Sequence, residues 1–231
     1  ALEGVDRVVH LAAIVGDPAC ARDPVVAREV NLEATRTLLD DLAGTTVKRC
    51  LFASTCSNYG KMADNSVYAT EEFDLSPVSL YAETKVGAEL EVLRRSDDSL
   101  VTACLRLATV YGVSPRMRFD LTVNEFTREV ALGAELLVFG EQFWRPYVHV
   151  RDAARALCRA LEAPAADIRG EVFNVGSTAE NYRKLIMAMA EDARATAETV
   201  RDDVMIEIPA VGAAGGDPLP GFLSGIFGPS H

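Results

Sequence analysis

Hydrophobic positions along the chain alternate between short apolar runs and longer stretches that are apolar at every third or fourth residue. The short runs, which are typical of buried strands, begin at about Arg7 and span Val47–Ala53, Leu100–Leu107 and Glu171–Val175. The stretches at 24–42, 81–95 and 153–161 have the spacing of helices with one apolar face. This βαβ rhythm predicts an α/β fold, a doubly wound parallel sheet.

Further elements follow the same pattern more weakly. The sequence predicts a helix at 121–132, a short strand at 136–139, and an extended segment at 144–150 that leads into Asp152 as the N-cap of the next helix. Beyond Asn181 the period fades. Residues 182–205 suit one alanine-rich helix, and residues 209–231, rich in Gly and Pro, suit a loose tail.

A phenol and an ammonium lie four residues apart at the start of one predicted helix. Tyr81 and Lys85 therefore share a helix face, followed by the apolar positions Val86, Leu90 and Leu93. A neighbouring lysine stabilises a phenolate and lowers the phenol pKa from about 10, so that the tyrosine can act as a base. Taken alone, the same spacing is also common on solvated helices.

Two polar segments come after predicted strands, where parallel sheets form their ligand crevice. The cluster Ser54–Gly60 follows the second strand, although its residues also suit a plain turn. The loop after the third strand contains Arg116 and Arg118. Their guanidinium groups suit an anionic ligand such as a phosphate, or else are solvated surface charges.

Composition excludes several classes of function. A hydrophobic fraction of 49% and a charged fraction of 25% are those of a globular protein, and no apolar run reaches the roughly 20 residues that a membrane span needs. The net charge of −11 argues against a nucleic-acid partner. The five scattered cysteines and three distant histidines show neither a disulfide framework nor metal-ligand spacing, which favours a reducing cytoplasm and predicts no metal.

From residue 1 to about residue 180 the sequence resembles the extended short-chain dehydrogenase/reductase family, specifically its NAD-dependent nucleotide-sugar epimerases and dehydratases. Order and spacing both agree. The residues that carry the resemblance are His10-Leu11-Ala12-Ala13, Asn31, Ser54-Thr55, Tyr59-Gly60, Tyr81 with Lys85, Arg106, Tyr111-Gly112, Arg145, Tyr147-Val148-His149-Val150, Asp152 and Asn174-Val175-Gly176.

The resemblance implies a role for each site residue, with NAD as cofactor and a nucleotide sugar as substrate. Tyr81 would be the acid/base, Lys85 would hold the nicotinamide ribose, and Thr55 would hydrogen-bond the sugar hydroxyl. Substrate contacts would come from Arg145, which meets the phosphates, together with Arg118 and Thr109. The other residues expected around the cofactor are Leu11, Ala12, Ala13, Asn31 and Ser54.

The sequence departs from the family pattern in three places. The Gly-x-x-Gly-x-x-Gly turn that binds NAD pyrophosphate does not occur in these residues, so the chain resembles a fragment. Thr109 stands where the family often has Asn. Cys56 and Ser57 follow Thr55 where 4,6-dehydratases carry Asp-Glu, and a thiol or a hydroxyl is a weak proton donor to a leaving hydroxyl.

These observations predict a 4-epimerase that oxidises C4 transiently, with a 4,6-dehydratase or a 4-ketoreductase as the alternative. A catalytically inactive, truncated scaffold that serves as a binding module is a second alternative. The predicted domains are a partial Rossmann-like NAD-binding domain at 1–111, incomplete at the N-terminus, a mainly substrate-binding lobe at 112–208 and the tail at 209–231. Residues 144–176 contribute to both parts. The resemblance implies a homodimer in which the helices at 24–42 and 81–95 pair with their copies, and C2 symmetry favours this arrangement.

Overall fold

The computed structural model describes residues 2–62, 69–134, 144–176 and 180–181. The chain divides into two compact units, the first made of residues 1–108 and 151–176 and the second of residues 109–150 and 177–231. The predicted strand at 136–139, the predicted helix at 182–205 and the tail at 209–231 lie outside the described residues. The domain boundaries predicted from the sequence stay a prediction.

The first unit is built on a four-stranded parallel sheet in the order β1-β2-β3-β7. Its strands are β1 (Arg7–His10), β2 (Arg49–Thr55), β3 (Val101–Leu107) and β7 (Glu171–Val175). Arg7 pairs with Arg49, Phe52 with Cys104 and Leu107 with Val175, so all carboxyl ends meet at one edge. The predicted parallel sheet is thereby confirmed.

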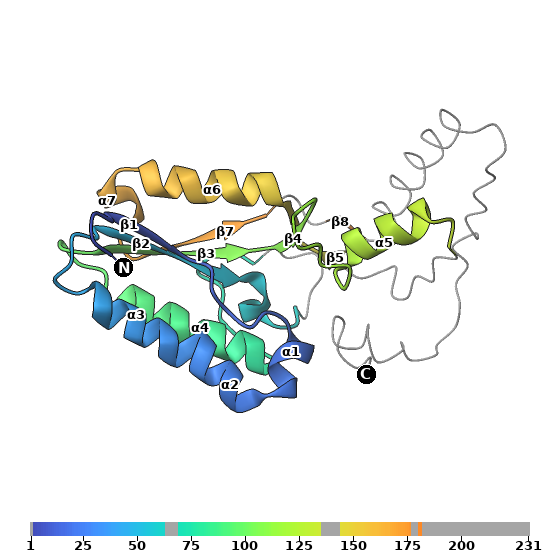
Figure 1. The fold of residues 1–231 in the computed structure, drawn as a ribbon, viewed down its shortest axis with the longest axis horizontal. Coiled ribbons are helices and arrows are strands. Elements are labelled where there is room, and N and C mark those ends of the chain that lie inside the picture. The colour runs from blue at the N-terminus through green and yellow to red at the C-terminus, as the bar shows by residue number, and fades with distance from the viewer. Residues whose placement is uncertain (1, 63–68, 135–143, 177–179, 182–231) are drawn as a thin grey trace. The chain divides into compact units, whose positions relative to one another are not determined.

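Helices cover both faces of this sheet (Figure 1). One face carries α1 (Asp17–Arg22), α2 (Pro24–Arg28), the π-helical turn η1 (Glu29–Glu33), α3 (Ala34–Leu42) and α4 (Leu80–Arg94). The other carries α6 (Val150–Glu162) and α7 (Ala165–Ile168). Phe52 packs under the first layer with Leu39 and Val92, whereas Leu51 and Leu105 pack under the second. Both faces are therefore apolar, as in a doubly wound sheet.

Three details differ from the sequence prediction. The helix at 24–42 contains the π-helical turn, in which Asn31 is buried. Strand β2 extends through Thr55, so Ser54 and Thr55 belong to the strand and only the 3₁₀ turn η2 (Cys56–Tyr59) follows it. The prediction that Asp152 is an N-cap is wrong, because α6 begins at Val150 and Asp152 lies in its first turn, paired with Arg155 at 3.2 Å.

In the part of the second unit that the structure describes, there are two small sheets and one helix. Strand β4 (Thr109–Tyr111) pairs in parallel with β6 (Tyr147–His149), and β5 (Trp144–Arg145) pairs antiparallel with β8 (Glu180–Asn181). Helix α5 (Thr122–Ala131) confirms the helix predicted at 121–132. Among the described helices of both units, none has the length and apolar character needed to cross a membrane.

Candidate active site

Helix α4 presents Tyr81, Lys85 and Glu89 at intervals of four residues. The helix begins where Ser79, in extended conformation, caps it by accepting a hydrogen bond from Ala82 N at 3.3 Å. The Ser79 hydroxyl donates in turn to Asp17 Oδ1 at 2.5 Å. The first turn of α4, which carries the half-buried Tyr81, is therefore fixed to α1.

Lys85 is a buried cation, only 3% exposed. Its Nζ lies 4.3 Å from the centroid of the Phe52 ring, on the neighbouring strand. Burial lowers the pKa of Lys85 to about 8, and electrostatic interactions with Cys104 and then Glu89 act in the opposite direction. With a pKa of about 8, Lys85 can exchange a proton near neutral pH, and its expected action on Tyr81 stays a prediction.

His10, at the carboxyl end of β1, is held in a neutral form beside this lysine. Its Nε2 lies 3.0 Å from Thr35 Oγ1, whose own proton is donated to Asn31 O at 2.9 Å. Because that hydroxyl has one proton, His10 Nε2 must be the donor of the first bond. Burial lowers the pKa of His10, and the charge of Lys85 lowers it further.

The segment after β1 ends in a loop held by the side chain of Asn31 and by the thiol of Cys20, which donates to Ile14 O at 3.3 Å. Leu11 and Ala12 are exposed and Ala13 is half-buried, so all three are accessible where the sequence places the cofactor. Asn31 Oδ1 accepts from Ile14 N at 2.7 Å, and its Nδ2 donates to Ile14 O at 3.0 Å. The same Nδ2 reaches Thr84 Oγ1 on α4 at 3.2 Å. The amide of Asn31 is thus occupied by the protein, and it joins the loop to α4.

The end of β2 brings Thr55 and Ser54 to two different environments. Thr55 is buried, and its Oγ1 accepts from Ser57 N at 3.2 Å, which starts η2. The Ser54 hydroxyl donates to Glu89 Oε2 at 2.6 Å in the interior. Ser54 therefore faces α4 beneath the strand end. The ligand contacts predicted from the sequence for Ser54 and Thr55 stay predictions.

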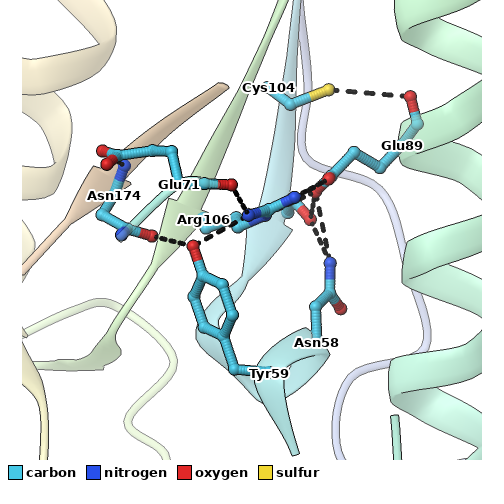
Figure 2. Close-up of polar contacts among 8 residues, drawn as sticks. Asn58, Tyr59, Glu71, Glu89, Cys104, Arg106 and Asn174 are labelled. Carbon is cyan, nitrogen blue, oxygen red and sulfur yellow. Dashed lines mark hydrogen bonds and ion pairs between the residues drawn. The ribbon is translucent and has the colours of Figure 1, made fainter. Parts of the chain in front are cut away.

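A buried polar network, which the sequence interpretation missed, lies behind these residues (Figure 2). Glu89 is 1% exposed and accepts from Asn58 Nδ2 at 3.2 Å and from the Arg106 guanidinium at 2.5 to 3.3 Å. Arg106 donates from its other end to the Tyr59 hydroxyl at 2.8 Å, and this hydroxyl donates to Asn174 Oδ1 at 2.7 Å. A signal existed, since Glu89 continues the four-residue spacing of Tyr81 and Lys85.

The predicted substrate residues Thr109, Arg118 and Arg145 all belong to the second unit. Thr109 is half-buried in β4 and its N–H donates to Pro146 O at 3.1 Å, while Arg145 is half-buried in β5. Arg118 donates from Nε to Asp120 Oδ1 at 2.9 Å and thereby lowers the pKa of that carboxyl. Its guanidinium has an intramolecular partner, and the substrate contacts of these residues stay predictions.

Known proteins resemble the chain in sequence. A model of the NAD dependent epimerase/dehydratase family matches residues 1–176. The uncharacterized UDP-glucose epimerase YtcB of Bacillus subtilis strain 168 is 30% identical over 196 residues, which cover 83% of this chain and 59% of that protein. The chain thus spans about three-fifths of the length of this curated relative.

Solved structures resemble it in fold. UDP-glucuronic acid 4-epimerase from Bacillus cereus, in complex with UDP-glucuronic acid and NAD, matches with a TM-score of 0.73 and 26% identity over 82% of this chain and 60% of that one. The dTDP-glucose 4,6-dehydratase DesIV from Streptomyces venezuelae, with NAD bound, matches with a TM-score of 0.70 and 28% identity over 82% and 58%. Epimerases and dehydratases are thus about equally similar in fold.

Proposed function

The chain belongs to the NAD dependent epimerase/dehydratase family, and we propose that the protein is a nucleotide-sugar 4-epimerase. The observation that carries the proposal is the placement of Tyr81 and a buried Lys85 on one helix face, with neutral residues after Thr55. The family uses NAD, and the chemistry of these side chains fits the nicotinamide-ribose half of that cofactor. When bound, NAD supplies the acceptor for a hydride.

In this proposal Tyr81 removes the proton from the C4 hydroxyl of the sugar and later returns it. The charge of Lys85, in the turn that follows, favours the phenolate form of Tyr81 and places an ammonium donor for the ribose hydroxyls. Thr55, at the end of β2, donates to the sugar oxygen. An apolar surface beside the cofactor is formed by Leu11, Ala12 and Ala13. The side chains of Leu11 and Ala12 are exposed and therefore accessible to it. Arg118 and Arg145 bind the phosphates of the substrate.

The choice of a 4-epimerase over a 4,6-dehydratase rests on the residues at 56 and 57. Elimination of water from C5 and C6 needs an acid and a base in addition to Tyr81. Cys56 and Ser57 stand at the positions expected to supply them, and Ser57 uses its N–H to bond Thr55 Oγ1. Because neither Cys56 nor Ser57 is a carboxylate, we favour transient oxidation at C4 and return of the hydride to the opposite face of the sugar.

The test is to incubate the full-length protein and NAD with a panel of nucleotide sugars and to separate the products by chromatography. We expect inversion at C4 with the C6 oxygen retained. A 4-keto-6-deoxy product would support the dehydratase alternative instead. Absence of any product, together with absence of NAD binding in calorimetry, would favour the inactive scaffold.

The proposal includes a homodimer in a reducing cytoplasm. Val25 on α2 and Leu90 on α4 are 65% and 45% exposed, on the helices predicted to meet their copies. An interface would remove this apolar surface from water. Light scattering on the full-length protein should give twice the monomer mass, and monomer alone at micromolar concentration would contradict the assembly.

A further inference from the structure

Glu89 connects three elements that carry the proposed site. It lies on α4, two turns beyond Tyr81 and one beyond Lys85. Its carboxylate accepts from Ser54 Oγ, next to Thr55 in β2, and from Asn58 Nδ2 in η2. We propose that Glu89 is a positioning residue, whose carboxylate fixes the strand end that bears Thr55 against the helix face that bears Tyr81 and Lys85. This inference deepens the proposed function and rests on it.

The charge of Glu89 is compensated within the protein. Arg106, 5% exposed on β3, contacts both carboxylate oxygens, and its Nη1 also donates to the Tyr59 hydroxyl and to Glu71 O at 2.8 and 3.0 Å. Figure 2 shows this arrangement, with Arg106 lying between Glu89 and Tyr59. A buried ion pair with its remaining positions hydrogen-bonded specifies one geometry, because any displacement leaves a charge unpaired.

Glu89 also affects the proposed chemistry through space. Titratable groups face Lys85 from each packed element: His10 from β1, Cys20 from α1, Cys104 from β3 and Glu89 from α4. Of these, only Glu89 is a carboxylate. It supports the charged form of Lys85, whose pKa burial holds at about 8.

Two variants separate the hydrogen bond between Glu89 and Ser54 from the negative charge of Glu89. Glu89→Gln removes the negative charge, whereas Ser54→Ala removes the hydrogen bond to β2 and keeps the ion pair. Glu91→Gln is the matched control, since Glu91 lies on the same helix and pairs instead with Arg36 at 2.9 Å. The Lys85 midpoint is measured by NMR titration of the full-length protein, labelled with ¹³C in its lysine side chains. A Lys85→Arg variant assigns the signal.

We expect Glu89→Gln to move the Lys85 titration midpoint to lower pH by about half a pH unit or more, and Glu91→Gln to leave it unchanged. Ser54→Ala should keep the midpoint and lower kcat by about 10-fold, because Thr55 is displaced. An unchanged midpoint in folded Glu89→Gln, or a normal kcat in Ser54→Ala, would overturn the inference. If Glu89→Gln does not fold, Ser54→Ala decides. If the wild type has no epimerase activity, the proposed function fails and the NMR titration alone decides.

Discussion

Replacing Asn31 by Ala should destabilise the protein more than any surface change in the same helix. The substitution removes four side-chain hydrogen bonds, to Ile14 N at 2.7 Å, to Ile14 O at 3.0 Å, to Thr84 Oγ1 at 3.2 Å and to Cys20 Sγ at 3.8 Å. At about 1 kcal/mol for each of the three shorter bonds, the loss is about 3 kcal/mol. The Ile14 N–H loses its Asn31 acceptor and adds to this loss, whereas Ile14 O keeps the Cys20 thiol as a donor. This is a large part of the 5–15 kcal/mol typical of a folded domain.

The assay is urea unfolding of the full-length protein, followed by circular dichroism. Glu33→Ala is the control, because Glu33 ends the same π-helical turn and its side chain makes an exposed pair with Arg36 at 2.8 Å, which solvent screens. We also expect weaker NAD binding by Asn31→Ala in calorimetry, since the loop at 11–16 loses its attachment to α4. A difference of less than about 1 kcal/mol between the two variants would refute the idea that Asn31 holds this loop.

Three other changes test the site. Tyr81→Phe should keep its folded circular dichroism spectrum and lose several orders of magnitude in kcat, because the ring still packs but the base is lost, and near-normal turnover would rule out its role. Turnover should fall as pH rises through about 8, where Lys85 loses its proton. Between that pH and 10.5, Lys85 is protonated in the unfolded chain but not in the folded chain. The free energy of unfolding of the wild type, relative to that of Lys85→Met, should therefore increase as the pH rises. Gly60→Ala should lower the free energy of unfolding in urea by more than about 3 kcal/mol, because its Cβ would lie 1.9 Å from Ser76 O. The control Gly44→Ala has a similar φ but open space around it, so it should lower the same free energy by about 1 kcal/mol. Equal losses in the two variants would contradict the predicted clash.

The sequence predicted those features that depend on local periodicity. The strands near Arg7, Val47, Leu100 and Glu171 and the helix that starts at Tyr81 lie within a few residues of their observed bounds. Apolar runs and four-residue spacing are properties of a continuous segment, so that no knowledge of distant contacts is needed. The family resemblance, which depends on the order of short motifs, is confirmed by the family match over residues 1–176.

Only the tertiary structure decided which polar groups meet. The sequence pattern did not single out Glu89, since its contacts depend on Ser54 and Arg106, which lie 35 and 17 residues away. The expected place of Asn31 at the cofactor stays a prediction, and the structure adds that its amide bonds Ile14 in the loop after β1. Hydrogen bonds between elements depend on how these elements pack, and a pattern of single residues along the chain determines hydrophobic faces but not polar partners.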